Sequence, residues 1–301
     1  MSSIITPPTA VSLSTEEESQ GTSLWADAYH RLWKNKLAVF GLLFITFEIL
    51  ICLVTPWIAP FGFEEQNLEN TLATPSLTHL MGTDNLGRDL FTRVLYGGRV
   101  SMMVGLLASM VSVIVGVIYG AIAGFIGGRT DNVMMRIVDI LYALPFIFMV
   151  IILMVYFGRN ILLLFVALGL TQWLTMARIV RGQVISLKHK EFIEAAHSMG
   201  IRTTSIIFRH LIPNALGPVI VYLTLTVPAV ILEEAFLSFL GLGVQAPMAS
   251  WGTLISSGVE VMEIAPWILL FPAFMLSVTL FSLNFLGDGL RDALDPKGAK
   301  D

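Results

Sequence analysis

The chain has 301 residues, of which 55% are hydrophobic and only 13% are charged, and its mean hydropathy is +0.77. A soluble domain carries about 25% charged residues, so this chain cannot cover its own surface with polar groups. The composition therefore argues against a water-soluble enzyme and predicts an all-α membrane protein in contact with the lipid bilayer. The net charge of −4 shows no basic excess, which argues against nucleic acid as a partner.

The first segments of the chain are polar or amphipathic. Residues 1–22 are rich in Ser, Thr, Pro and Glu, which predicts a disordered cytoplasmic tail. In residues 23–36 apolar side chains such as Trp25, Tyr29 and Trp33 recur at helical spacing before Lys34. This pattern predicts an amphipathic helix in the inner membrane interface, with a simple basic anchor as the alternative.

A membrane span needs about 20 largely apolar residues. Six runs meet this condition, and a seventh, Ala235–Val259, is rich in Gly and Ser and contains Pro247. The six predicted spans are Leu37–Ile58, Val100–Ile126, Ile140–Gly158, Asn160–Ala177, Leu211–Leu232 and Ile264–Gly287.

Positive charge decides the status of the seventh run. Lys and Arg concentrate in cytoplasmic segments. With six spans and both termini cytoplasmic, 14 of the 18 positive residues lie inside, whereas a seventh span would give 11 against 7. We therefore expect six transmembrane helices, with residues 235–263 as a periplasmic segment that forms a short helix or a re-entrant turn.

The remaining segments follow from this topology. Residues 59–99 form a long periplasmic loop, which we expect to fold as a small cap. Residues 100–290 form a core of five spans, and residues 291–301 form a cytoplasmic tail.

The cytoplasmic loop 188–213, between the fourth and fifth spans, carries two predicted helices. In the first, Phe192, Ala195, Ala196 and Met199 share one narrow apolar face, and Gly200 ends the helix as a C′ glycine. The second extends from Thr203 or Thr204, as N-cap, to His210, and Pro213 marks the entry into the fifth span. Physical reasoning alone leaves two alternatives, an interfacial helix with basic flanks or a rigid docking element for a soluble partner.

The same loop resembles a known family. Glu194-Ala195-Ala196, then Gly200, and then His210-Leu211-Ile212-Pro213 are similar to the EAA loop of ATP-binding-cassette importer permeases. The segments Gly82–Asp84, Gly87–Asp89, Ser238–Gly243 and Gly287–Asp292 also resemble the peptide-importer branch, and in particular its C-type permease subunit.

The resemblance implies a type I importer architecture and a set of partners. Glu194, Ala195, Ala196 and Gly200 would couple this chain to the ATPase. The partners would be a homologous permease subunit, two ATP-binding subunits, and a periplasmic or lipoprotein solute-binding protein. The substrate would be a peptide, most simply an oligopeptide, with dipeptides, nickel complexes or glutathione as alternatives.

The motifs that are absent limit the chemistry. The sequence contains no phosphate-binding G-x-x-x-x-G-K-[ST] loop, so we expect no cofactor in this chain, with ATP and Mg on the partner ATPase subunits. No catalytic residue and no metal site are predicted. Glu48 is the only charge deep in a span, where a helix–helix hydrogen bond is the more common role for a single acid. An ion-coupled carrier or channel without an ATPase is the alternative from a different class.

Several further residues have two interpretations. Glu234, at the end of the fifth span, is either an interfacial stop or a group at the mouth of the pathway that meets a peptide amine. Asp139 and Asn284 are expected to hydrogen-bond between helices. Pro145 lies inside the third predicted span and predicts a kink. The small-residue spacing of Gly116, Gly120 and Gly124 predicts close helix packing.

Overall fold

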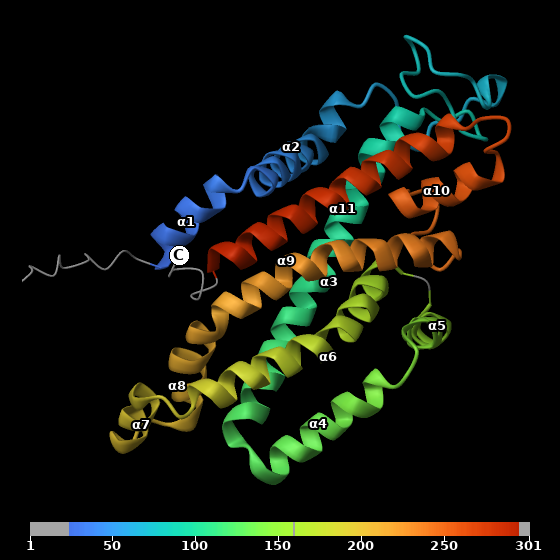
Figure 1. Ribbon diagram of the computed structural model, residues 1–301. Coiled ribbons are helices and arrows are strands. Elements are labelled where there is room, and N and C mark those ends of the chain that lie inside the picture. The colour runs from blue at the N-terminus through green and yellow to red at the C-terminus, as the bar shows by residue number, and fades with distance from the viewer. Residues whose placement is uncertain (1–23, 159, 295–301) are drawn as a thin grey trace, which may run out of the picture.

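The computed structural model describes residues 24–158 and 160–294. These residues form an elongated bundle of helices with no β-strand in the described ranges (Figure 1). The helices are α1 (Leu24–Lys34), α2 (Lys36–Ile58), α3 (Leu90–Ile126), α4 (Gly128–Tyr142), α5 (Phe146–Phe157), α6 (Ile161–Leu187), α7 (Glu191–Ser198), α8 (Thr203–Ile206), α9 (Ile212–Phe239), α10 (Trp251–Glu260) and α11 (Trp267–Leu294), with a short 3₁₀ turn η1 (Leu68–Asn70) and a π-helical turn η2 (Ile207–Leu211).

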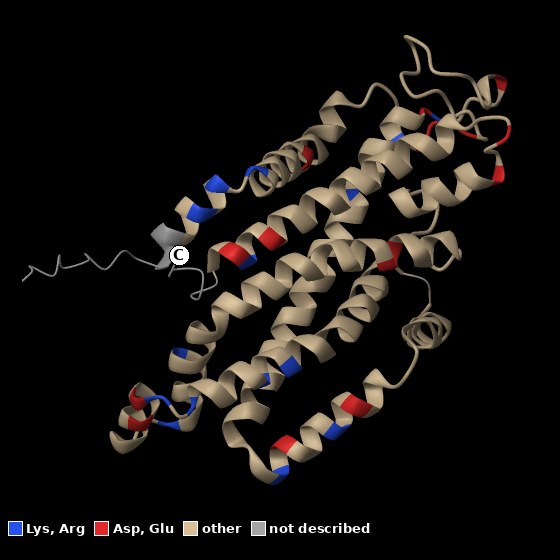
Figure 2. Cartoon of the chain, viewed as in Figure 1, with Lys and Arg blue, Asp and Glu red and all other residues tan. Residues whose placement is uncertain are grey.

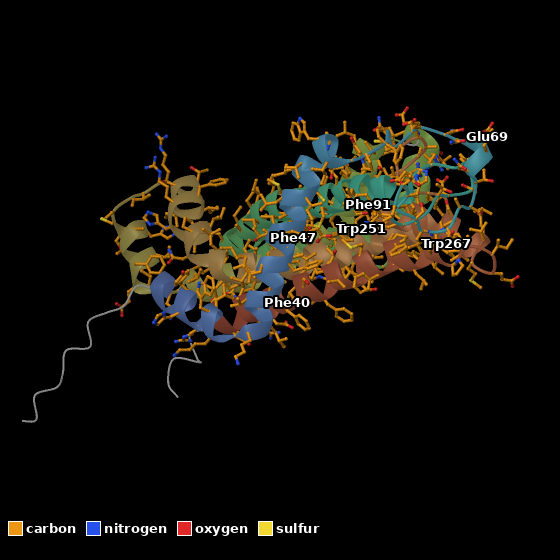
Figure 3. The ribbon with its side chains drawn as sticks, turned by 90° about the horizontal axis from the view of Figure 1, so that it is seen from above. Phe40, Phe47, Glu69, Phe91, Trp251 and Trp267 are labelled. Atoms are coloured by element: carbon orange, nitrogen blue, oxygen red, sulfur yellow. The ribbon has the colours of Figure 1, made fainter. Side chains whose placement is uncertain are left out.

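Five helical segments in the described ranges are long and apolar enough to cross a membrane, and a bent pair of helices raises the number to six. The five are α2, α3, α6, α11 and the continuous helical segment Thr203–Phe239. Phe40 and Phe47 project from the side of α2 that faces away from the bundle (Figure 3). Such outward apolar side chains fit a helix that faces lipid.

The third predicted span, Ile140–Gly158, is not one helix. Helix α4 ends at Tyr142, α5 begins at Phe146, and the two are bent by 87°. Pro145 lacks an N–H and restricts the residue before it, which explains a break at this position. Helix α5 has 12 residues, a length of roughly 18 Å, which is too short to cross the hydrocarbon core alone. The predicted kink is therefore a complete break.

The helices extend beyond the apolar runs that predicted them. Helix α3 begins at Leu90, inside the predicted outer loop, and α6 continues to Leu187, past the predicted end at Ala177. Helix α11 continues to Leu294, into the predicted tail 291–301. Hydropathy marks the part of a helix that lipid can surround, and a helix continues wherever its backbone hydrogen bonds continue.

Small residues bring α3 against α6, as the sequence predicts. A Cβ atom added at Gly116 or Gly120 would collide with α6, at Met176 and Ala177 respectively. Helix α3 therefore lies at the centre of the bundle, packed against both α6 and α9, and α11 packs between α2 and α9 (Figure 1).

The loop between α2 and α3, called the outer loop here, is folded, as expected. The Asp84 carboxylate accepts hydrogen bonds from the Leu86 and Arg88 backbone N–H groups and from Arg88 Nε at 2.7 Å. The Asp89 carboxylate caps α3 by accepting from the Thr92 N–H, and it also pairs with His79 Nδ1 at 2.8 Å. The acidic residues therefore hold the turn in shape.

The seventh apolar run contains a short helix, as expected. Helix α10 begins with a capping box between Ser250 and Thr253. Trp251 is buried, and its indole N–H donates to the Val94 carbonyl of α3. Figure 3 shows Trp251 among the packed helices, whereas Glu69 lies at the tip of the outer loop. The segment is therefore part of the core of this end of the bundle.

Helix α1 is formed where the sequence predicts an amphipathic helix. Ala28 is buried, while Tyr29 and Trp33 are exposed, with their rings 5.9 Å apart. The predicted disordered tail 1–22 lies outside the described residues, as do residues 295–301.

Candidate coupling surface and buried polar clusters

Helix α7 is fixed to the end of the bundle from which the loop 188–213 projects. Its side chains Ile193 and Ala196 are buried in a cluster with Val184 of α6, Val117 of α3 and Ile207. A buried cluster of this kind resists independent movement of the helix. Helix α7 is therefore rigidly attached to the membrane-spanning helices.

The opposite side of α7 presents apolar side chains to solvent. Phe192 is 41% exposed and Met199 is 72% exposed, and Ala195 lies between them. This corrects the predicted apolar face, because Ala196 belongs to the buried side with Ile193. The helix has two apolar stripes, one covered by the bundle and one, made of Phe192, Ala195 and Met199, left open; we call the open one the coupling face.

Gly200 ends α7 as predicted. Its φ is +72°, a conformation that favours glycine. Its N–H donates to the His197 carbonyl, and the Ile201 N–H donates to the Ala196 carbonyl. These two bonds form a Schellman motif, which turns the chain back toward the bundle.

The second predicted helix of the loop is not separate from the fifth span. Helix α8 begins at Thr203, with Arg202 as N-cap and no side-chain capping bond, so neither Thr203 nor Thr204 is the cap. The chain does not leave the helix at His210 but passes through η2 into α9. The π turn accommodates Pro213, which has no N–H to continue the α-helical pattern. The loop is thus mechanically continuous with α9.

Charged side chains surround the coupling face. Figure 2 shows acidic residues on α7 and basic residues in the loop segments beside it, whereas the middle of the bundle is largely uncharged. Glu194 is exposed and forms no ion pair within the described residues. The coupling role of Glu194, Ala195, Ala196 and Gly200 stays a prediction.

Glu234, the predicted mouth residue, is fully buried, with 0% of its surface exposed. Ser238 Oγ donates to its Oε1 at 2.6 Å, and Ser101 Oγ donates to its Oε2 at 3.3 Å. Ser101 also accepts the Trp251 backbone N–H. The carboxyl group thus joins α3, α9 and the start of α10, and its predicted contact with a peptide amine stays a prediction.

Glu48 and Asp139 form the helix–helix contacts that the sequence predicts. Thr279 Oγ1 of α11 donates to Glu48 Oε1 at 2.8 Å, while Glu48 Oε2 has no partner. The Arg178 guanidinium donates to Asp139 at 2.9 Å and lies over the Tyr142 ring. Asn284 differs from the prediction, because it donates to the Leu280 carbonyl of its own helix.

One ion pair has no counterpart in the sequence analysis. Arg181 of α6 donates through Nε and an Nη atom to both oxygens of Asp131, at 2.5 and 2.6 Å. The two residues are 50 positions apart, so no local spacing reveals the pair. The only signal for the pair in the sequence is that both residues are predicted to lie on the same side of the membrane, next to predicted spans. This pair holds the first turn of α4 against α6.

The chain matches a known family over most of its length. Residues 116–300 match the family described as "binding-protein-dependent transport system inner membrane component". Residues 23–75 match the "N-terminal TM domain of oligopeptide transport permease C".

Relatives support this assignment. The oligopeptide transport system permease protein OppC of Escherichia coli (strain K12) is 54% identical over 96% of both chains. The dipeptide transport system permease protein DppC of Bacillus subtilis (strain 168) is 48% identical over 90% of this chain and 85% of that protein. The glutathione transport system permease protein GsiD of Shigella flexneri is 40% identical over 91% of this chain and 90% of that protein.

A solved structure confirms the fold. A chain of the MetNI methionine ABC transporter in an inward-facing conformation matches with a TM-score of 0.55 at 18% identity, covering 68% of this chain and 96% of that chain. At this identity the likeness concerns the fold alone, and it agrees with the permease architecture predicted from the EAA loop. The chain therefore belongs to the family of binding-protein-dependent transport system inner membrane components and is a multi-pass protein of the inner membrane.

Proposed function

We propose that this chain forms half of the translocation pore of an ATP-driven peptide importer, with oligopeptides as the substrate. The name of the relative at 54% identity supports the oligopeptide assignment. The dipeptide and glutathione permeases among the relatives make those substrates the alternatives within the same assembly, together with nickel complexes.

The observation that carries the proposal is the combination of a buried and an open apolar stripe on α7. The buried stripe, Ile193 and Ala196, attaches the helix to α3, α6 and α9. The open stripe presents Met199 and Phe192 outside the bundle. Exposed apolar patches that are rimmed by charges mark protein contact sites. A soluble partner that grips the coupling face would therefore move the spanning helices with it.

The mechanism is alternating access. ATP binding would draw together two ATPase subunits, each attached to the coupling loop of one permease subunit. Helix α7 would transmit this movement through the Ile193 and Ala196 cluster to α6, and through η2 to α9. The spans would then tilt and open the pore toward the solute-binding protein. Hydrolysis would return the inward-facing state, and no covalent step takes place in this chain.

Binding-protein-dependent permeases work with an ATPase and a solute-binding protein. We propose the finer composition of one homologous permease subunit and two ATPase subunits. The solute-binding protein would sit on the outer-loop end of the bundle. ATP and Mg would reside on the ATPase subunits. Within the described residues, no group of three or more His, Cys, Asp or Glu could hold a metal ion.

The ion-coupled alternative needs ionisable groups that face a passage. Glu234 is bound by two serine hydroxyls and fully buried, and Glu48 is bound by Thr279 between two helices. These contacts favour packing roles for both acids. The ion-coupled alternative therefore has less support than the importer, which the family match favours.

Charge placed on the coupling face tests the proposal. Met199→Glu puts a carboxylate on an open apolar contact, so we expect at least a tenfold loss of ATPase subunits that co-purify with the chain, because a buried unpaired charge is costly. Leu77→Glu is the matched control, because Leu77 is 98% exposed in the outer loop, at the other end of the bundle. Equal co-purification for both variants would show that α7 is not the docking element.

A further inference from the structure

A pocket of about 390 Å³ lies between the coupling loop and the end of α3. It is lined by Phe125, Ile126, Lys188, His189, His197 and Thr203. Four segments of the chain contribute to it, namely the last turn of α3, the connection between α6 and α7, helix α7, and the first residue of α8. The pocket is therefore a feature of the folded chain and does not need a partner to form.

The polar lining of the pocket is rich in groups that donate hydrogen bonds. Lys188 supplies an ammonium group, and Thr203 supplies a hydroxyl. Each of the two histidines offers at least one N–H in either protonation state. No acidic residue is among the lining residues. A cavity of this kind suits an anion with several acceptor oxygens.

Lys188 has no strong partner of its own. Its Nζ donates to the Gly124 carbonyl at 3.4 Å, a long hydrogen bond. The nearby carboxylate, Asp131, already receives two short hydrogen bonds from Arg181. Lys188 lies close enough to Asp131 to interact with it electrostatically, but no ion pair joins the two in the described residues, so the ammonium group can take a further anion.

The other wall of the pocket is apolar and fixed. The Phe125 ring stacks on the His197 ring with centroids 5.7 Å apart and planes inclined by 4°. Ile126 is exposed beside it, at the point where the spanning helix α3 ends. The pocket therefore lies at the edge of a membrane span, with an apolar side and a cationic side, which is the level of lipid headgroups.

We propose that this pocket binds a phosphate group, with Lys188 as the main charge and His189, His197 and Thr203 as hydrogen-bond donors; Ile126 would contact the acyl part when the phosphate belongs to a lipid. The phosphate group belongs either to an anionic lipid headgroup or to a free phosphate ion. The pocket is separate from the coupling face, because Phe192, Ala195 and Met199 are not among its lining residues. The site is independent of which peptide the importer carries.

The test uses the full chain in maltoside micelles that contain equal amounts of phosphatidylglycerol and phosphatidylcholine, with native mass spectrometry to count retained lipids. We expect Lys188→Gln to retain phosphatidylglycerol at least about tenfold less well than the wild type, because a charge-assisted hydrogen bond is lost. Lys188→Arg keeps the charge and should keep the lipid. Lys190→Gln is the matched control, because it removes one positive charge from the same connection between α6 and α7 without touching the pocket.

A second arm adds inorganic phosphate to the wild-type chain. Displacement of the lipid would assign the site to free phosphate, and retention would assign it to the lipid headgroup; both outcomes support the pocket if they depend on Lys188. Equal lipid retention by Lys188→Gln and Lys190→Gln would overturn the proposal. Loss of the lipid when ATPase subunits bind the wild-type chain would also overturn it, since the pocket would then belong to the subunit interface.

Discussion

Gly200 fixes the direction in which the chain leaves α7. Its positive φ is needed for the Schellman motif that closes the helix, while no atom beyond its chain neighbours lies within 4 Å of a Cβ placed there. A substitution at Gly200 therefore acts through backbone conformation and not through a steric collision.

Gly200→Ala should destabilise the chain by about 1 kcal/mol, because a side chain in the left-handed region is strained. Gly182→Ala is the control, since Gly182 lies inside α6, also with open space around its Cβ position, and alanine favours a helix by roughly 0.5–1 kcal/mol. The two variants should shift the thermal unfolding midpoint in detergent in opposite directions. A lowered midpoint for both, or for neither, would contradict the backbone explanation.

Removal of the Glu234 carboxylate should lower the stability of the chain. Glu234→Ala would leave the Ser101 and Ser238 hydroxyls without their acceptor in a buried site, at a cost of about 1–3 kcal/mol for an unsatisfied group. Glu234→Gln keeps one acceptor oxygen and should cost less. Thermal unfolding of the two variants measures the difference, and an alanine variant as stable as the wild type would rule out the packing role.

The buried state of Glu234 could not be predicted from the sequence. Its partners Ser101 and Ser238 are ordinary residues of two different helices, and Ser101 is 133 positions away. The position at the end of an apolar run suggested an exposed carboxylate. Only the packing of α3, α9 and α10 together shows that the group is enclosed.

At the scale of the elements, α4 is attached to the bundle by apolar contacts and by charges, because Val138 is buried in a cluster with Trp173 and Leu174 of α6. It packs mainly against α3 and α6, and its two ion pairs both reach α6. Asp131 lies in the first turn, with its side chain 11% exposed, whereas the Asp139 side chain near the other end is 57% exposed. The two pairs therefore differ in how strongly solvent screens them.

Asp131→Asn should loosen α4 more than Asp139→Asn does. A bidentate pair that is largely shielded contributes more than an exposed pair, which contributes about 0–1 kcal/mol. We expect hydrogen exchange of the α4 amides to accelerate roughly tenfold in Asp131→Asn and little in Asp139→Asn. Faster exchange in Asp139→Asn than in Asp131→Asn would show that the exposed pair, and not the shielded one, holds α4 in place.

Most helices were predictable because hydrophobic length is a local property of the sequence. The apolar runs therefore located α2, α3, α6, α9 and α11, and Gly200 located the end of α7. The 87° bend between α4 and α5 was not predictable, because Pro145 fixes where the helix breaks but not the direction of the second part. The two stripes of α7 were likewise hidden, since Ala195 and Ala196 are equivalent until the neighbouring helices are placed.

At the scale of the whole molecule, the proposed function depends on how the coupling face connects to the spans. The cluster around Ile193 and the continuous segment from Thr203 to Phe239 give two routes from one end of the bundle toward the other. At the opposite end of the bundle, α10 and Glu234 pack against α3 beside the loop between α2 and α3. A partner at the coupling loop can thus influence helices that reach the opposite side.

Peptide uptake by reconstituted proteoliposomes tests the central claim most directly. The full assembly of this chain, a homologous permease subunit, the ATPase subunits and the solute-binding protein is supplied with a labelled oligopeptide. Uptake should require both the solute-binding protein and ATP on the side of the membrane that carries the ATPase subunits. Glu194→Ala should reduce uptake while leaving the chain folded. Uptake by this chain alone, driven by a proton or sodium gradient without ATP, would contradict the account.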